Sequence, residues 1–142
     1  MSGAANVSEA PETPDDIETI LVVDDEVLIR MPIAEYLRDC GYRVVEAANG
    51  DEAIAVLTAT DCKIDLILSD VQMPGTVDGF ALARWVRKHL PDIEIILTSG
   101  YAGAAQQSKE LCIEKNFVPK PFEFERLLHH IKQSLARRER KT

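Results

Sequence analysis

Short apolar runs alternate with longer amphipathic stretches along most of the chain. The runs are rich in Ile, Leu and Val, and they predict strands at 19–25, 42–47, 63–70, 93–99 and 116–120. The longer runs are continuously apolar rather than alternating with polar residues. That pattern is typical of a parallel sheet covered on both faces.

The stretches between the runs carry apolar residues at helical spacing. They predict helices over 27–39, 50–60, 79–90 and 123–138, and a less regular Ala- and Gly-rich helix over 102–113. Asn49 and Asp78 stand where N-caps are expected, and Glu52 completes a capping box with Asn49. Pro32 falls inside the first helix, where we expect a kink or an irregular first turn rather than loss of the helix.

Five strands alternating with five helices make a (βα)5 chain of the α/β class. We predict a doubly wound, five-stranded parallel sheet of flavodoxin-like topology, with strand order 2-1-3-4-5. Pro119 agrees with this order, because it places the fifth strand at an edge, where proline is tolerated.

Composition indicates one globular domain. The chain has 142 residues and is 46% hydrophobic, which suits a single folded unit. No apolar run reaches the roughly 20 residues that span a bilayer, and the amino end lacks a secretion signal. We therefore expect a cytoplasmic protein. Its three cysteines, with no CxxC spacing, are expected to be small, partly buried residues rather than a zinc site.

The net charge of -8 is unevenly spread along the chain. Residues 1–18 contain five acidic residues and no Lys or Arg, so we interpret them as a disordered acidic leader. Residues 19–138 form the folded domain, and 139–142 a short basic tail. One short basic run on an acidic chain does not indicate nucleic-acid binding, and no feature indicates a membrane partner.

Polar residues stand at the ends of four predicted strands. Asp24 and Asp25 end the first strand, Asp70 the third, Thr98 the fourth and Lys120 the fifth. The carboxyl ends of parallel strands meet at one edge, where ligands of such folds bind. We therefore expect all five side chains on one rim.

Three carboxylates brought this close raise one another's pKa values unless a cation binds. A hard divalent ion with oxygen ligands, Mg²⁺ with Mn²⁺ as a substitute, resolves the repulsion. Lys120 is a mobile point charge that suits a phosphoryl oxygen, and the Thr98 hydroxyl donates one hydrogen bond. With this charge compensation, a carboxylate oxygen could attack phosphorus and form an aspartyl phosphate.

Four sequence pieces, "LVVDDE", "LILSDVQMPG", "ILTSGYA" and "FVPKPF", occur in this order at four successive strand ends. Together they resemble the receiver domain of two-component response regulators of the CheY-like superfamily, over residues 18 to 138. The resemblance implies that Asp70 is the phosphoacceptor. It also implies that Asp24, Asp25, Asp70 and the backbone carbonyl of Gln72 bind the metal.

The resemblance assigns the remaining site residues as well. Thr98 and Lys120 would hold the phosphoryl group, and Thr98 and Phe117 would form the switch. The Lys120–Pro121 peptide bond would be cis, in a turn that aims the lysine inward. Three features depart from the commonest pattern: one extra residue in "GTV" before Asp78, a glycine at position 100 that leaves phosphoryl lifetime unspecified, and a Phe117 without a hydroxyl.

The function implied is a phosphorylation-controlled signalling switch, not an enzyme acting on a metabolite. A histidine kinase or histidine phosphotransfer protein would donate the phosphoryl group. The face formed by the helix at 102–113, the strand at 116–120 and the helix at 123–138 would then bind a downstream protein or a second copy of the chain. We expect either a single-domain regulator or a receiver piece of a larger protein.

Two alternatives from other classes stay open. A receiver-like module could dock partners without being phosphorylated. A Mg²⁺-dependent phosphohydrolase of the haloacid dehalogenase type also uses Asp, Thr and Lys, but it would need a DxD motif after the first strand, where this chain has Asp24-Asp25-Glu26. Nucleotide binding is disfavoured, because no Gly-rich loop follows that strand.

Overall fold

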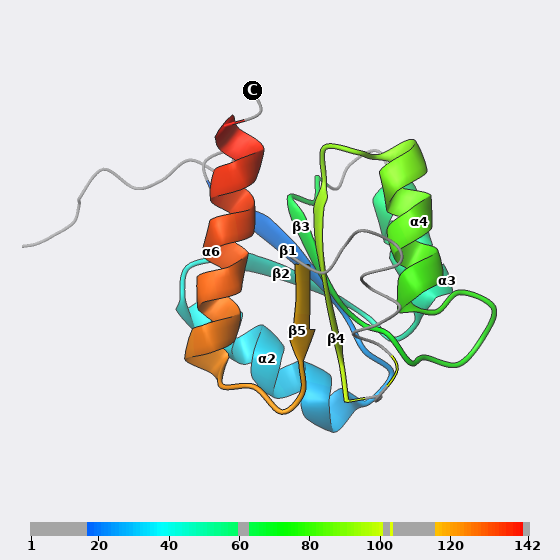
Figure 1. Cartoon of the computed structure of the whole chain (residues 1–142), viewed down its shortest axis with the longest axis horizontal. Helices are drawn as coiled ribbons and strands as arrows, with labels where there is room; N and C mark the ends of the chain where they lie inside the picture. Colours follow the sequence, from blue (N-terminus) through cyan, green and yellow to red (C-terminus); the bar gives the residue numbers. More distant parts are fainter. Residues whose placement is uncertain (1–16, 60–62, 101–102, 104–115, 141–142) are drawn as a thin grey trace, which may run out of the picture.

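A parallel sheet of five strands forms the centre of the molecule (Figure 1). The computed structural model describes residues 17–59, 63–100, 103 and 116–140. The strands are β1 (Thr19–Val23), β2 (Arg43–Ala47), β3 (Leu66–Asp70), β4 (Glu94–Ser99) and β5 (Phe117–Pro119). Their order is β2-β1-β3-β4-β5 and every pairing is parallel, which confirms the predicted topology.

Helices cover both faces of this sheet. They are α2 (Val27–Asp39), α3 (Gly50–Thr58), α4 (Gly79–His89) and α6 (Phe124–Arg140). In Figure 1, α2 and α6 lie on one face and α3 and α4 on the other. The helix predicted over 102–113 lies outside the described residues, apart from Gly103. Among the helices that the structure describes, none combines the length and apolar content that crossing a bilayer requires.

Each face of the sheet has its own buried core. One core joins β1, β3 and β4 to α3 and α4, and it includes Leu21, Ile67, Leu97, Phe80 and Val86. The other core joins the alternate strand residues to α2 and α6, and it includes Val22, Leu68, Ile96, Leu37 and Ile131. Adjacent strand residues belong to opposite cores because side chains alternate along a strand.

Local sequence features explain where the helices begin. The Asn49 side chain accepts a hydrogen bond from the Glu52 N–H at 2.8 Å, and the Glu52 carboxylate accepts one from the Ala48 N–H at 2.8 Å. Asp78 caps α4 by accepting from the Ala81 N–H at 2.8 Å. Both predicted caps are confirmed.

Two predictions about α2 can be compared with the structure. The helix continues across Pro32 to Asp39, as expected. Its last turn is followed by Cys40, which is exposed, so the expectation of a partly buried cysteine is wrong at this position. Cys40 is the C-cap residue and lies beyond Ile33, Ala34 and Leu37, the buried residues of the helix. The other two cysteines, and residues 1–16 of the predicted leader (1–18), lie outside the described residues.

Candidate functional site

Four strands bring polar side chains to one rim of the sheet through a common register. Each of these residues stands two positions after a buried residue of the α2–α6 core, in the pairs Val22–Asp24, Leu68–Asp70, Ile96–Thr98 and Val118–Lys120. Because side chains alternate, a spacing of two returns to the same face. The register therefore directs all four polar side chains to the α2 side of the carboxyl rim.

Three carboxylates meet on this rim. Oxygen atoms of Asp24, Asp25 and Asp70 all lie within 4.8 Å of one another. Asp24 and Asp70 are 4% and 7% exposed, whereas Asp25 is exposed to solvent. The Asp24 carboxylate also accepts a hydrogen bond from the Glu26 N–H at 2.9 Å, which fixes its orientation. The predicted convergence of these acids is thus seen in the structure.

Lys120 provides the positive charge beside them. Its Nζ lies 3.3 Å from Asp70 Oδ1 and 3.7 Å from Asp24 Oδ2. The Lys120 N–H donates to the Ser99 carbonyl at 3.0 Å, which ties the residue to the end of β4. The Lys120–Pro121 peptide bond is cis, as predicted. The lysine therefore faces the acids rather than bulk solvent.

The environment of Asp70 opposes its ionisation. Burial raises the pKa of Asp70 above its ordinary value of 3.8, and the nearby Asp24 carboxylate raises it further. The Lys120 ammonium and the Val71 N–H lower that pKa, but they do not cancel the cost of burial. A bound cation would remove this residual penalty, because it favours the charged form.

Thr98 and Phe117 occupy neighbouring strands but opposite faces of the sheet. Thr98 is buried and pairs in register with Asp70 across β3 and β4, and its carbonyl accepts from the Val71 N–H at 2.9 Å. Phe117 pairs with Leu97, the residue before Thr98, and packs on the core formed with α3 and α4. Thr98 and Phe117 are therefore linked through the backbone of β4, because Leu97 pairs with Phe117 and precedes Thr98.

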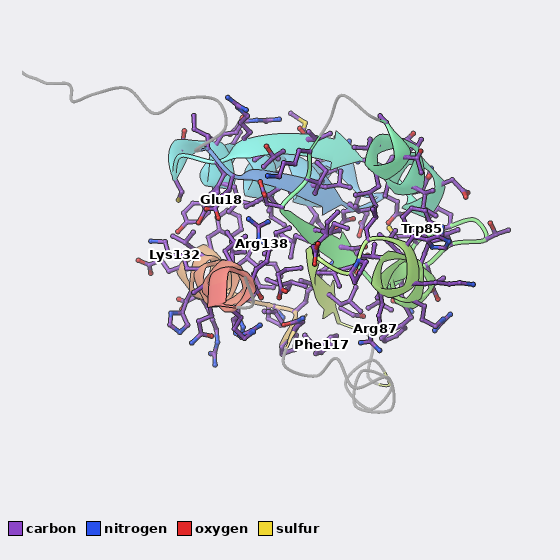
Figure 2. All side chains as sticks on the ribbon, turned by 90° about the horizontal axis from the view of Figure 1, so that it is seen from above. Glu18, Trp85, Arg87, Phe117, Lys132 and Arg138 are labelled. Carbon is purple, nitrogen blue, oxygen red and sulfur yellow. The ribbon has the colours of Figure 1, made fainter. Side chains whose placement is uncertain are left out.

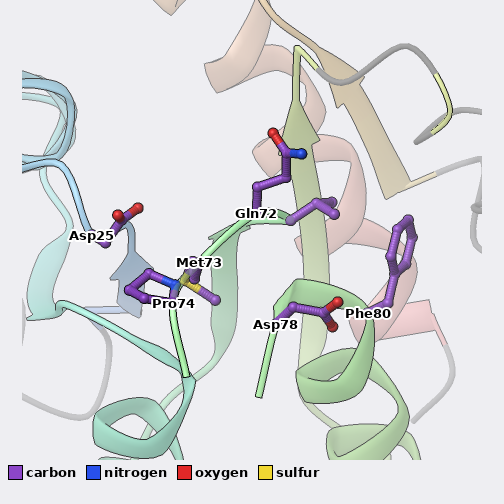
Figure 3. Close-up of a pocket in the computed structure, with 7 residues that line it drawn as sticks. Asp25, Gln72, Met73, Pro74, Asp78 and Phe80 are labelled. Atoms are coloured by element: carbon purple, nitrogen blue, oxygen red, sulfur yellow. The ribbon is translucent and has the colours of Figure 1, made fainter. Parts of the chain in front are cut away.

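The loop after β3 borders the acid cluster. Gln72 and Met73 on this loop line a cavity of about 420 Å³, together with Asp25 and Asp78 (Figure 3). The close packing of this loop requires a glycine at position 79, because a Cβ there would clash with the Asp70 carbonyl. Gln72 and Asp25 thus line the same cavity, and the Gln72 side chain is exposed.

The donor set fits a hard divalent cation. It consists of carboxylate oxygens from three residues, with no thiol or imidazole among them, and such oxygens are the ligands that Mg²⁺ and Mn²⁺ prefer. The exposed position of Asp25 leaves one side open to water and to a further oxygen ligand. The arrangement can therefore hold a metal beside a nucleophilic carboxylate.

A second, more apolar cavity of about 590 Å³ opens beside Lys120. Its lining comes from α2, from the residue after β4 and from the segment after β5, namely Leu28, Ile29, Pro32, Ile33, Gly100, Lys120, Pro121, Phe122 and Phe124. Val27, Leu28 and Met31 of α2 are large apolar residues that are 44%, 86% and 49% exposed. An apolar surface thus lies next to the charged rim.

Arg30 also contacts this site, although it is not among the residues predicted from the sequence. The Arg30 Nη1 donates to the Asp24 backbone carbonyl at 2.7 Å, and its Nε donates to Glu46 Oε1 at 2.9 Å. An arginine one turn into a helix is usual, and only the crossing of α2 over β1 and β2 brings it to Asp24. No local pattern in the sequence predicts that contact.

Comparison with known proteins gives one consistent match. The family model described as the response regulator receiver domain matches residues 20–132. The sensor kinase CckA of Brucella abortus is 38% identical over 122 residues, which is 85% of this chain but only 13% of that protein.

Two solved receiver structures match over nearly their whole length. A CheY-like receiver domain protein from Methanospirillum hungatei has a TM-score of 0.79 and 28% identity, covering 89% of this chain and 99% of that one. TrrA of Thermotoga maritima, solved in complex with Mg²⁺ and BeF, has a TM-score of 0.72 and 33% identity, covering 82% of this chain and 98% of that one.

Proposed function

This chain belongs to the family of response regulator receiver domains, and we propose that within it Asp70 accepts a phosphoryl group from a phosphohistidine of a partner protein. The observation that carries this proposal is the geometry of the rim. A buried carboxylate lies 3.3 Å from the Lys120 ammonium, and its oxygens lie within 4.8 Å of those of two further acids. Phosphoryl transfer requires mainly positioning and charge compensation, which this arrangement supplies.

Asp24, Asp25, Asp70 and the Gln72 backbone carbonyl would hold Mg²⁺, with Mn²⁺ as a substitute. The bound ion would neutralise negative charge on the carboxylates and on the phosphoryl oxygens. Support comes from the three converging carboxylates and from Gln72, which lines the same cavity as Asp25.

The reaction itself uses an oxygen of Asp70. That oxygen attacks phosphorus as the P–N bond to the donor histidine breaks, and the bonding electrons return to the imidazole nitrogen. Lys120 and the Thr98 hydroxyl then hold the phosphoryl oxygens, and attack by water later regenerates the carboxylate. The chain in this way assists its own phosphorylation and dephosphorylation, and acts on no metabolite.

The partner protein that carries the phosphohistidine would dock on the apolar cavity beside Lys120. A protein-borne phosphohistidine must reach Asp70 from outside the rim, so its carrier must cover the surface next to Lys120. That surface includes the exposed side chain of Leu28 and the lining residues Pro32 and Phe122. Burial of such apolar area favours association.

Phosphorylation would act as the switch that changes partner binding. The added charge would draw Thr98 toward the phosphoryl group and let Phe117 move inward, which alters the face containing β5 and α6. That face would bind a downstream protein or a second copy of the chain. The division into a leader (1–18), a receiver domain (19–138) and a basic tail (139–142), and a cytoplasmic location, also remain predictions.

Incubation with Mg²⁺ and acetyl phosphate, followed by intact-mass measurement, tests the proposal. We expect one added phosphoryl group that is stable in acid and labile in base, and its absence in Asp70→Asn. Steady phosphate release from many organic phosphates would favour the phosphohydrolase instead. No modification at any donor concentration would favour a module that only docks.

A further inference from the structure

The Arg30 guanidinium joins the end of β1 to the middle of β2. Its Nη1 donates to the Asp24 carbonyl at 2.7 Å and its Nε donates to Glu46 Oε1 at 2.9 Å. The side chains of Arg30 and Glu46 are only 15% and 25% exposed. This arginine is therefore held at two separate points, and neither is a contact with a carboxylate of the acid cluster.

The contact with Arg30 completes the fixation of Asp24. The Asp24 N–H donates to the Ala47 carbonyl at 3.1 Å, and the Asp24 carboxylate accepts from the Glu26 N–H at 2.9 Å. With the Asp24 carbonyl bound by Arg30, every polar group of this residue has a partner. The orientation of the Asp24–Asp25 peptide plane is therefore determined.

That peptide plane determines where Asp25 lies. Asp25 is exposed, and its carboxylate makes no hydrogen bond within the part of the chain that the structure describes. Its position next to Asp24 and Asp70 consequently depends on the backbone that carries it. Arg30 is the side chain that holds this backbone from outside the cluster.

We propose that Arg30 is a positioning residue that orients the Asp24–Asp25 peptide, and so presents both carboxylates to the divalent cation. This inference rests on the proposed function of the acid cluster as a metal site. Glu46 assists by holding the guanidinium at its Nε. Hydrogen bonds from outside a metal site commonly orient its ligands in this way.

If Arg30 acted only through its charge, removing it would change Mg²⁺ affinity in the opposite direction from a loss of orientation. Loss of a positive charge near three carboxylates would make the site more negative and would strengthen cation binding. Loss of orientation would weaken binding. The sign of the change in Mg²⁺ affinity therefore separates the two roles.

Calorimetric titration with Mg²⁺ makes this test, with Arg30→Met compared to Arg38→Met. Arg38 donates to Glu46 at 3.3 Å and to the Val44 carbonyl at 3.1 Å, so it shares the acidic partner without touching Asp24. We expect Arg30→Met to weaken Mg²⁺ binding about tenfold, and Arg38→Met to leave it nearly unchanged. Equal or tighter binding by Arg30→Met would overturn the inference, provided that both variants unfold at similar temperatures.

Backbone ¹⁵N relaxation in the absence of metal gives a second, independent measurement. We expect the Asp25 amide to become more mobile in Arg30→Met than in wild type or in Arg38→Met. Arg30→Lys keeps the charge but not the planar pair of donors, so it should remain impaired; full recovery with lysine would contradict positioning by the guanidinium. If wild type itself fails to bind Mg²⁺, the metal site is refuted, while the mobility of Asp25 still decides the role of Arg30.

Discussion

Asp70 combines burial with a proposed function that requires its carboxylate to be charged. It is 7% exposed, and Lys120 is the cation that lies within 4 Å of it in the described part of the chain. Burial makes the ionised carboxylate unfavourable, and either a bound proton or a bound metal ion would relieve that cost. The residue that we propose as the phosphoacceptor is therefore also one whose burial, when ionised, lowers the stability of the metal-free fold.

We predict that Asp70→Asn raises the thermal stability of the metal-free protein at pH 7. Because burial raises the pKa of Asp70 in the folded state, its contribution to stability is complete below the ordinary pKa and is lost as pH rises through the raised one. Asparagine avoids that loss. A gain of about 1 kcal/mol would raise the melting temperature by about 3 °C.

Thermal unfolding of both proteins at pH 7 and near pH 4 measures this difference. The difference in melting temperature between the two proteins should narrow as the pH falls, because Asp70 then takes up a proton in the folded state. Added Mg²⁺ should stabilise wild type more than Asp70→Asn, since the metal binds the folded state and loses one ligand in the variant. A variant that melts below wild type at pH 7 without metal would contradict the prediction.

Helix α6 is fixed to the sheet at the end opposite the acid cluster. The buried Asp65, just before β3, accepts from Arg138 Nη1 at 2.7 Å and from the Thr19 N–H at 2.8 Å. Figure 2 shows Arg138 on the side of α6 that faces the sheet. This pair connects the carboxyl end of α6 to the starts of β1 and β3.

We expect Arg138→Met to lower the free energy of unfolding by about 2 kcal/mol, because it leaves Asp65 buried without its cation. Urea denaturation measures the change, and Lys132→Met, at an exposed position of the same helix, serves as the matched control. Mg²⁺ affinity should stay at the wild-type value, since the ion pair is remote from the rim. A loss of stability equal to that of the control would refute the role of the pair.

The exposed apolar side of α2 leads to a prediction about partner recognition. Leu28 is 86% exposed and lines the cavity beside Lys120. We expect Leu28→Ser to slow phosphorylation by the cognate histidine-phosphorylated protein severalfold, and to leave phosphorylation by acetyl phosphate unchanged. Time courses with the two donors measure this, and Cys40→Ser at the far end of the same helix is the control. If phosphorylation by both donors slowed equally, Leu28 would affect the phosphoryl-transfer step rather than docking of the partner.

Strands and helices with strong local patterns were predictable from the sequence, and so was the meeting of strand ends that follows from their order. Contacts that depend on how a helix crosses the strands were not predictable. The runs around β1, β3 and β4 are apolar enough to identify, and each ends in a site residue, so the convergence of Asp24, Asp70, Thr98 and Lys120 followed from topology. The contact of Arg30 with the Asp24 carbonyl depends on how α2 crosses two strands. A pattern along the chain carries no information on that crossing.

At the scale of the whole molecule, the sheet separates a reactive end from a structural end. The carboxyl rim gathers Asp24, Asp70 and Lys120, while the opposite end contains the Asp65–Arg138 pair. Between these two ends, the central strands β1, β3 and β4 are entirely buried. We therefore expect a conformational change at the rim to pass from strand to strand along the carboxyl edge of the sheet more easily than through the buried core.

β5 is the strand through which such a change would spread. It has three residues and pairs only with β4 in the sheet, and its next residue, Lys120, contacts the acids. A short edge strand opens at low free-energy cost. By contrast, β2 is the edge strand that supplies no residue to the acid cluster.

We predict that phosphorylation changes amide hydrogen exchange in β5 and at the end of β4, and leaves β2 unchanged. The phosphoryl group would recruit Thr98 and Lys120, and both are bonded into the β4–β5 pairing through their backbones. Exchange followed by mass spectrometry, with excess acetyl phosphate and Mg²⁺, measures the difference against Asp70→Asn under the same conditions. A change in β2 as large as that in β5 would show that the signal passes through the core, and the edge route would then be wrong.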